Sequence, residues 1–435
     1  MCGKGLAADL MFSESCKVYN LHNWRTIPQI KNLSAEDIES VETAARVFPF
    51  KVNAYVSEHL IDWANGAEDP LFRMLFPHRD MLCEDDFAAL KELIRRGSDS
   101  EIANKVLEIR RRLNPNPADQ LSNVPLFRGK TLTGIQHKYR ETVLIFPTEG
   151  QSCFAWCTFC FRWPQFCRTD VMRFSGSSGE DVCAYLQEHK EVSDVLLSGG
   201  DPLTMAPERL SRYLQALLSP GLEHVRNIRV GSKALSWYPQ LILQESFVPV
   251  LRAFEGISAA GRSITFAANL CHPRELQNAD FQNALRRVQR SGAVVRAQGP
   301  LLRGVNDSAE ALAELWREEV RWGIVPYYLF AARDTGARTA FQLPLLRAWE
   351  IYRSAYASVS GLCRSARGPV MSCTPGKVQI LGPGSFNGSK ALSLIFLQCR
   401  RPELVGRPFF AEYDERALWW DQLRPLTEAD REFFC

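Results

Sequence analysis

The stretch GQSCFAWCTFCFRWPQFC (150–167) sets four cysteines among aromatic side chains. Three of them, Cys153, Cys157 and Cys160, stand in the spacing C-x3-C-x2-C. This spacing is short enough for their thiolates to converge on one metal centre without a regular element between them. Soft thiolate ligands select iron–sulfur clusters or zinc. The stretch is therefore a candidate metal-binding loop, called the Cys loop below.

Two kinds of metal centre could use this loop. A structural zinc site needs four closed ligands, and Cys167 is the candidate for the fourth, but it lies beyond FRWPQF with no second close pair of cysteines. A 4Fe-4S cluster held by three cysteines leaves one iron open, and an open iron can bind a small chelating ligand. The spacing favours the reactive iron–sulfur site.

The Cys loop follows the first of six apolar runs rich in β-branched and aromatic residues. These runs predict strands at 142–147, 194–198, 227–231, 263–268, 293–298 and 325–330. The stretches between and after them predict helices near 179–190, 207–218, 245–255, 279–291, 308–322 and 345–360. Repeated βα units of this length form either a doubly wound sheet or a barrel with parallel strands.

Unusual residues follow the carboxyl end of every predicted strand. After the Cys loop come SGGDPL (198–203), GSK (231–233), NLCHP (269–273), QGPLLRGVND (298–307) and AARDTGAR (331–338). Barrels gather their chemistry on such loops, whereas a flat sheet would spread the loops over two crevices. The sequence therefore predicts an α/β fold with a partial (β/α)6 barrel at 136–343. A mostly helical N-terminal extension is expected at 1–135, and a C-terminal extension with interface elements at 344–435.

Composition excludes several classes of partner. The 52 basic and 49 acidic residues leave a formal net charge of +3, which gives no nucleic-acid footprint. No run of about 18 apolar residues is present, and the start MCGKGLAADLMFSES lacks the features of a secretory signal. The 13 cysteines are mostly scattered, unlike a secreted disulfide framework. We expect a cytoplasmic protein that binds neither nucleic acid nor membrane.

These motifs resemble the radical S-adenosylmethionine (SAM) superfamily and, within it, the lysine 2,3-aminomutase family, of which this chain would be a divergent member. The matching stretches are HKYRETVLI (137–145), the Cys loop with Arg162, SGGDPL, the His-Pro pair at 272–273, LLRGVND (301–307), PYYLF (326–330) and PGK (375–377). The resemblance implies that the open iron chelates SAM and that one electron cleaves it to a 5'-deoxyadenosyl radical. An external electron donor of the flavodoxin or ferredoxin type is then implied.

The resemblance also suggests where SAM would bind. The candidate SAM-binding residues are Ser198, Gly199, Gly200, Asp201, Ser232, Lys233 and Gln298, with Asn269 nearby and His272 as a pocket residue of unassigned role. The two glycines of SGGDPL would let the backbone approach the methionyl amine. The same motif also suits a turn with Asp201 capping the following helix.

Family members that move an α-amino group use pyridoxal phosphate (PLP), which a lysine holds as a Schiff base. Here the matching lysine is Lys377, which follows Pro-Gly in a loop shorter than the family's PGGGGK. On the phosphate side, Lys138 and Tyr139 correspond to the family's Arg-Tyr pair, and lysine binds phosphate as a point charge without the fork of arginine. The alternative is that Lys377 is an exposed lysine in a Pro-Gly turn.

The substrate contacts follow from the same comparison. Arg162 would face the substrate carboxylate. Lysine-acting members place two aspartates near the distal ammonium, whereas the aligned positions here are Arg333, followed by Asp334, and about Cys373. An arginine opposes an ammonium, because like charges about 4 Å apart cost about 4 kcal/mol at an effective dielectric near 20. If Arg333 instead pairs with Asp334 or Glu350, its charge is neutralised and a cationic substrate remains possible.

The sequence thus predicts a radical SAM 2,3-aminomutase acting on an amino acid other than lysine, acidic or neutral at its distal end. Lys377 and Arg162 are its candidate catalytic residues, and a homo-oligomer is expected. One alternative is a PLP-independent epimerase, lyase or other rearrangement enzyme on a small molecule or a protein-bound lysine. Another is a non-catalytic iron–sulfur protein for electron transfer or assembly, which would have no use for a SAM pocket.

Overall fold

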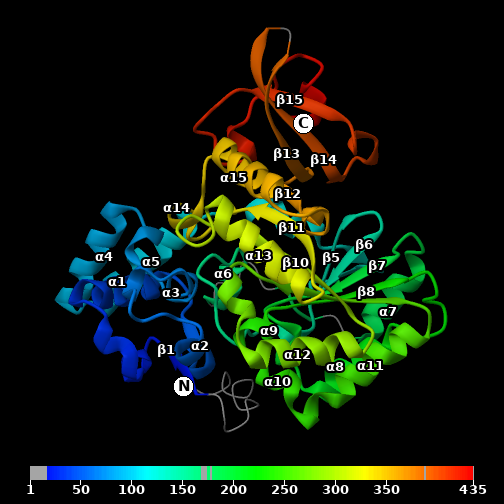
Figure 1. Cartoon of the computed structure of the whole chain (residues 1–435), viewed down its shortest axis with the longest axis horizontal. Coiled ribbons are helices and arrows are strands. Elements are labelled where there is room, and N and C mark those ends of the chain that lie inside the picture. The colour runs from blue at the N-terminus through cyan, green and yellow to red at the C-terminus, as the bar shows by residue number, and fades with distance from the viewer. Residues whose placement is uncertain (1–16, 168–173, 177–178, 387, 435) are drawn as a thin grey trace.

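The computed structural model describes residues 17–167, 174–176, 179–386 and 388–434. Its centre is an 11-stranded sheet with the strand order β15-β14-β13-β12-β11-β10-β9-β8-β7-β6-β5 (Figure 1). In the described ranges no helix is both long and apolar enough to cross a membrane. The segment 1–16, on which the expected lack of a secretory signal rests, lies outside the described residues.

Six strands form the barrel portion of the sheet and confirm the six predicted runs. They are β6 (Thr142–Ile145), β7 (Asp194–Leu197), β8 (Asn227–Ser232), β9 (Ser263–Asn269), β10 (Val294–Leu301) and β11 (Val325–Ala331). Every neighbouring pair among them is parallel. The strand β10 extends three residues beyond its predicted end because alternate side chains stay buried through Leu301. The predicted partial barrel is confirmed, since the sheet is open rather than closed.

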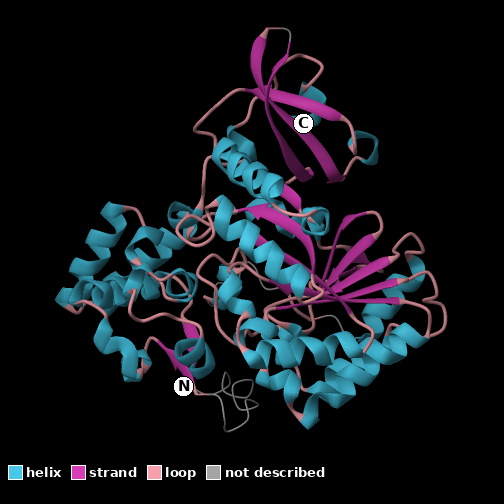
Figure 2. Ribbon diagram, viewed as in Figure 1, coloured by secondary structure: helices cyan, strands magenta, loops and turns pink. Residues whose placement is uncertain are grey.

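The predicted helices all occur on the outer face of these strands (Figure 2). They are α7 (Gly179–Glu188), α8 (Pro207–Ala216), α11 (Val248–Ala259), α12 (Ala279–Arg290), α13 (Ala309–Arg321) and α15 (Leu345–Ser358). Pro207 occupies the first turn of α8, and the Ser308 side chain accepts a hydrogen bond from the N–H of Ala311 to cap α13. Each helix buries one apolar face, as Phe281, Leu285 and Val288 of α12 show.

Additional strands extend the sheet at both ends of the barrel. At one end β5 (Ile135–Tyr139) runs antiparallel to β6. At the other, β12 (Arg367–Ser372) is parallel to β11 and is followed by antiparallel β13 (Gly376–Phe386), β14 (Ser389–Cys399) and β15 (Pro408–Glu412). These last three strands stand away from the barrel at the top of Figure 1 and cover a second core that includes Phe396, Phe409 and Trp419.

The N-terminal part is mostly helical and packs beside the barrel (Figure 1). Its helices are α1 (Ala35–Val47), α2 (Ala54–His59), α3 (Pro70–Leu75), α4 (Glu84–Arg96) and α5 (Asp99–Arg112). A short antiparallel pair, β1 (Val18–Asn20) and β2 (Lys51–Asn53), places β2 against the Cys loop. The 3-10 segment η6 (Pro117–Asn123) then leads to the sheet. A common apolar core joins this part to the barrel.

The remaining elements are short. They are β3 (Leu126–Phe127), β4 (Lys130–Thr131), α6 (Trp163–Phe166), α9 (Ala234–Trp237), α10 (Gln240–Leu243), α14 (Arg338–Phe341) and α16 (Arg431–Phe434). Of these, α6 lies within the last part of the Cys loop and α14 follows the loop after β11, so both lie near the residues predicted to do chemistry.

Candidate active site

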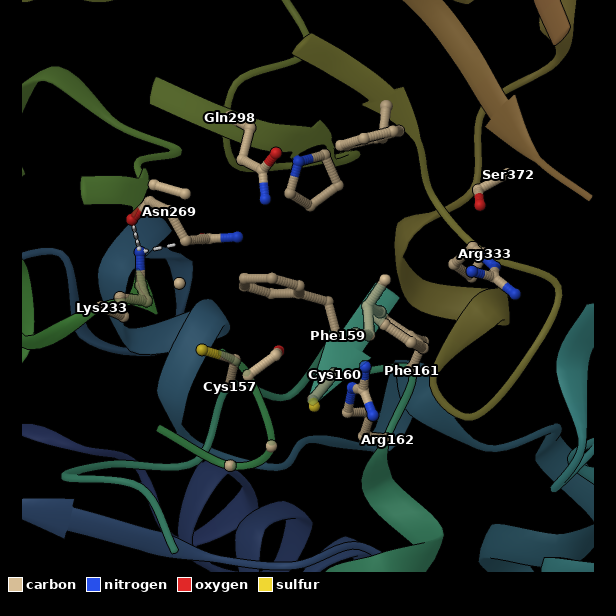
Figure 3. A pocket seen from close by; sticks show the side chains of 18 of the residues that line it. Cys157, Phe159, Cys160, Phe161, Arg162, Lys233, Asn269, Gln298, Arg333 and Ser372 are labelled. Carbon is tan, nitrogen blue, oxygen red and sulfur yellow. Dashed lines mark hydrogen bonds between the residues drawn. The ribbon is translucent and has the colours of Figure 1, made fainter. Parts of the chain in front are cut away.

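A cavity of about 390 Å³ lies inside the partial barrel. Its wall contains the Cys loop, the loops after β7, β8, β10 and β11, the carboxyl end of β9 and the start of β13 (Figure 3). In Figure 3, Cys157, Lys233, Asn269 and Gln298 lie on one side of the cavity, and Phe161, Arg333 and Ser372 lie on the other. Residues from the carboxyl ends of all six barrel strands or from the loops that follow them therefore face one space, as the loop pattern predicted.

The N-terminal part holds the backbone of the Cys loop. The N–H of Trp156 donates to the carbonyl of Lys51 at 2.8 Å, and the N–H of Thr158 donates to the carbonyl of Met74 at 2.9 Å. Asn53 Nδ2 donates to the carbonyl of Phe154 at 3.3 Å and to that of Trp237 at 2.8 Å. These bonds fix the part of the Cys loop that carries the cysteine motif, which has no helix or strand of its own, and explain one role of the N-terminal extension.

All three cysteines of the motif line the cavity. Among the described residues, no three His, Cys, Asp or Glu side chains are close enough to bind one metal ion together. A 4Fe-4S cluster places each thiolate on a different iron, so its sulfurs need not meet at one point, whereas zinc requires four ligands on one ion. Cys167 Sγ instead faces the carbonyl of Val47 at 3.7 Å. The donor set fits a cluster better than structural zinc.

Burial raises the pKa of the Cys157 thiol to about 12 and also raises the pKa values of Cys153 and Cys160. Thiols in such a site keep their protons until a metal replaces them, because the thiolate is the metal ligand.

The two glycines of SGGDPL lie directly against the Cys loop. A Cβ on Gly200 would come within 2.2 Å of the carbonyl oxygen of Ser152, and Gly199 has a φ of +145°, which side chains rarely adopt. The N–H of Gly200 donates to the carbonyl of Gly150 at 3.1 Å. Glycine is required here so that two loops can touch, in addition to any approach to SAM.

Asp201 joins this loop to the loop after β8. One carboxylate oxygen accepts the N–H of Leu203 at 3.0 Å, and the other accepts the Ser232 hydroxyl at 2.9 Å and the N–H of Lys233 at 2.8 Å. Burial raises the pKa of Asp201 to about 6. Asp201 and Ser198 both line the cavity, but the oxygens of Asp201 are used within the protein.

Lys233 is also held by protein groups. Its Nζ pairs with Glu275 at 2.6 Å and donates to the carbonyl and the side-chain oxygen of Asn269 at 2.9 and 3.3 Å. These partners use the three donors of the ammonium. Lys233 therefore positions Asn269 at the cavity wall, beside Gln298, which Figure 3 shows pointing into the same space.

Lys377 and the predicted phosphate-side pair meet at another part of the wall. Lys377 Nζ lies 4.7 Å from the ring centroid of Tyr328 and 5.7 Å from that of Tyr139. Loss of solvation, together with the positive charges of Arg229 and Lys138, lowers the pKa of Lys377 to about 7. Burial likewise lowers the pKa of Lys138 to about 8. Lys377 is the second residue of β13, is half-buried and lines the cavity, so it does not lie exposed in a turn as the alternative expected.

Two arginines flank Phe161 at the other side of the cavity. The guanidinium carbons of Arg162 and Arg333 lie 5.1 and 4.9 Å from the Phe161 ring centroid. Arg162 also stacks on Phe146 at 4.4 Å. Arg162 is 8% exposed, and burial lowers its pKa to about 10. Both arginines line the cavity.

Three predicted residues are not brought to the cavity wall, which corrects their expected place. His272 Nδ1 accepts the N–H of Arg274, so the ring caps the turn after β9. Asp334 accepts from Asn114 Nδ2 at 2.8 Å and faces the segment before η6. Cys373 is buried, and its carbonyl accepts from Lys138 Nζ. Polar residues after strands often serve turns, and sequence alone does not show which way they point.

The structure adds wall residues that sequence reasoning missed. They are Phe161, Arg229, Ser372 and Gln398 in the wall and Glu275 behind it. Phe161 stands between Cys160 and Arg162 in the motif, so its place could have been inferred from theirs. Arg229 lies on β8 and pairs with Asp194 of β7 at 2.7 Å. An inward-facing arginine within a strand was the available signal for it.

Comparison with known proteins agrees with this geometry. A protein of Aquifex aeolicus provisionally named L-lysine 2,3-aminomutase is 30% identical over 403 residues, which cover 92% of this chain and 94% of that protein. The L-lysine 2,3-aminomutase of Methanococcus maripaludis is 25% identical over 357 residues, covering 79% and 71% of the two chains. No protein-family profile matches the chain.

Among solved structures, a radical SAM methyltransferase from Sphaerobacter thermophilus aligns with a TM-score of 0.35 and 14% identity, over 55% of this chain and 68% of that one. The identity and coverage of the Aquifex protein establish the relationship by sequence. The chain belongs to the lysine 2,3-aminomutase family of radical SAM enzymes.

Proposed function

We propose that this radical SAM enzyme is a PLP-containing 2,3-aminomutase whose substrate is an amino acid other than lysine. The observation that carries the proposal is that Lys377, half-buried at the start of β13, lines the same cavity as Cys153, Cys157 and Cys160. An amine and a metal-binding loop that share one cavity can act on one bound molecule. Membership of the family already implies an iron–sulfur cluster and SAM.

In this proposal the three cysteines hold a 4Fe-4S cluster, and SAM lies between the cluster and the side of the cavity formed by Asn269 and Gln298. The cluster and SAM together supply a radical able to take an unactivated hydrogen. The hydrogen bonds of Asp201 to Ser232 and Lys233 hold the loop after β7 against the end of β8, and Lys233 orients Asn269. These residues thus shape the SAM side of the cavity.

Lys377 is the proposed attachment site of PLP, which would supply an imine for migration of the amino group. With its pKa lowered to about 7, the amine is substantially neutral at neutral pH and can attack an aldehyde. Lys138 offers its ammonium to the phosphate as a point charge, and Tyr139, whose ring lies near both lysines, can pack against a ring. The shorter Pro-Gly loop leaves the lysine inside the cavity.

The cavity wall argues against a substrate with a distal ammonium. Its described lining contains seven lysines and arginines but one carboxylate, Asp201, whose oxygens are already used. Asp334 faces away, and Cys373 is a buried thiol. Arg162 is left to bind the substrate's α-carboxylate, as in the family. The proposal also includes an external one-electron donor, a cytoplasmic location and a homo-oligomer.

Two measurements on anaerobically purified protein test the proposal. Reconstitution should give about four iron atoms per chain and reductant-dependent SAM cleavage, and Cys157→Ala should lose both while the control Cys183→Ala on α7 keeps them. Borohydride reduction after addition of PLP, followed by peptide mapping, should place a pyridoxyl group on Lys377. A label elsewhere, or none at saturating PLP, would favour the PLP-independent alternative.

A further inference from the structure

We infer that Arg162 and Arg333 form a two-point clamp for an α-amino dicarboxylate of aspartate or glutamate length. The inference rests on the proposed function and names its substrate class. Arg162 would bind the α-carboxylate, and Arg333 would bind the carboxylate at the other end of the same molecule. Both arginines and the ring between them, Phe161, line the cavity.

The two guanidinium groups share one aromatic ring, which limits how far apart they can lie. Each guanidinium carbon lies about 5 Å from the same Phe161 centroid, at 5.1 Å for Arg162 and 4.9 Å for Arg333. Figure 3 shows both arginines on the same side of the cavity as Phe161. Stacking holds a guanidinium by its face and leaves its edge donors available for a carboxylate. A short molecule with a carboxylate at each end can therefore reach both.

Each arginine keeps a buried donor without an acceptor. Arg162 Nη1 and Arg333 Nε are both buried and lack a hydrogen-bond partner. Arg333 donates once, from Nη2 to the carbonyl of Pro117 at 3.2 Å. A buried, unpaired donor on a charged group costs free energy. Two such donors in one cavity indicate that a bound anion completes the site.

The nearest carboxylate does not fill this role. Asp334 Oδ1 lies 3.9 Å from Arg333 Nε, which is beyond hydrogen-bonding distance, and the other oxygen is taken by Asn114. The Asp334 carboxylate therefore reduces the local positive charge without satisfying the donor. The same Arg333 charge repels a distal ammonium, and a neutral side chain would leave its donor unpaired.

The anion at Arg333 could instead be the phosphate of PLP, because Lys138 also lies near Arg333. The structure favours the substrate carboxylate. Arg333 shares its aromatic partner Phe161 with Arg162, so an anion bound at Arg333 lies near the group that would hold the substrate's α-carboxylate. The experiment below separates these two sources.

Calorimetry of the anaerobic holoenzyme, with S-adenosylhomocysteine in place of SAM to prevent turnover, tests the clamp. Glutamate, aspartate, glutamine and lysine are titrated in turn. We expect aspartate or glutamate to bind at least tenfold more tightly than glutamine and lysine. The clamp would be overturned if glutamine or lysine bound as tightly as, or more tightly than, both aspartate and glutamate. This comparison uses the wild-type protein, so it does not depend on whether any variant folds.

Arg333→Met keeps the apolar stem and removes the charge. We expect it to weaken dicarboxylate binding roughly thirtyfold or more while changing glutamine binding little. Arg333→Lys should recover part of the affinity, and Arg347→Met, an exposed arginine on α15, should behave as wild type. If Arg333→Met instead lowers PLP affinity and leaves the dicarboxylate-to-glutamine ratio unchanged, the anion is the phosphate and the clamp is wrong.

These outcomes also separate the clamp from the proposed function. Ligand ranking is a binding measurement, so it stands if no pyridoxyl group is found on Lys377. Conversely, a pyridoxyl group on Lys377 with no dicarboxylate preference keeps the aminomutase proposal and removes the clamp.

Discussion

Lys138 donates a hydrogen bond from its Nζ to the backbone carbonyl of Cys373, 235 residues further along the chain. The contact joins β5, at one end of the sheet, to the turn between β12 and β13, beyond the other end of the parallel barrel strands. An open barrel is thereby bridged by a side chain rather than by strand pairing. The Lys138 side chain lines the same cavity as Lys377. The contact across the open barrel and the proposed binding of the PLP phosphate therefore both depend on the Lys138 ammonium.

Replacement of Lys138 by methionine tests this double dependence. Loss of the ammonium removes the proposed phosphate contact, so the dissociation constant for PLP should rise at least about tenfold. Lys138→Arg should retain most of the affinity, because arginine keeps the charge and adds a fork. The measurement is a PLP titration followed by absorbance, with exposed Lys390→Met as the control. Equal PLP affinity in wild type and Lys138→Met would remove Lys138 from the phosphate site.

Holding the charged ammonium of Lys377 in the poorly solvated cavity wall lowers the free energy of unfolding, and the size of this cost depends on pH. Below about pH 7 the lysine is charged in both the folded and the unfolded chain, so the cost of burying the charge is complete. Between about pH 7 and its ordinary pKa near 10.5, the unfolded chain binds more protons, and the stability of the wild type rises with pH. Above that range both forms are neutral and this cost vanishes.

Lys377→Met should therefore stabilise the PLP-free protein, by on the order of a few kcal/mol at pH 6 and by progressively less toward pH 10. Denaturant unfolding of both proteins at several pH values measures the difference, and Lys390→Met is the control at an exposed lysine. A stability difference that does not change between pH 6 and pH 10 would contradict the burial of a charged Lys377.

Contact between the SGGDPL loop and the Cys loop predicts different outcomes for two nearby glycines. In Gly200→Ala the new methyl would meet the backbone of Ser152 at 2.2 Å, and backbone cannot move aside as a flexible side chain can. At Gly231, also in the cavity wall, the nearest atoms would be 3.5 and 3.6 Å away. We expect Gly200→Ala to lower both thermal stability and iron content, by about 1–3 kcal/mol in stability, and Gly231→Ala to bind iron as wild type does. Full iron content in Gly200→Ala would show that the loops need not touch.

Much of the barrel could be predicted because its signals are local. The alternation of buried residues in β7 and β10 and the cap at Ser308 are visible in the sequence. The strand β13 was missed because Gly382, Pro383 and Gly384 interrupt its pattern, and pairing with β14 supplies what its own residues lack.

The site could be predicted only in part, for a related reason. Lys233 and His272 both follow strands, yet one reaches the wall and the other caps a turn. That difference depends on the backbone direction after each strand. The orientation of Arg333 depends in addition on Pro117, more than 200 residues earlier in the chain. Contacts of this kind leave no periodic signal in a single sequence.

Asn53 links the N-terminal part to cluster binding. Its side chain is 1% exposed, donates to the carbonyls of Phe154 and Trp237, and accepts the N–H of Val56 as the cap of α2. Asn53→Ala removes the cap and leaves two buried carbonyls without this donor, which should destabilise the fold by on the order of 3 kcal/mol. Because one of those carbonyls belongs to the Cys loop, iron content should fall as well.

Asn53→Asp separates the two roles of this side chain. The carboxylate can still accept the N–H of Val56, but it cannot donate to the two carbonyls and would place negative charge against them. We therefore expect iron incorporation to fail in Asn53→Asp at least as completely as in Asn53→Ala. The matched control is Asn278→Ala, which removes the cap of α12; it should lower the melting temperature with iron content unchanged. Normal iron content in Asn53→Asp, measured at a temperature where the protein remains folded, would show that the N-terminal part is not needed to hold the Cys loop.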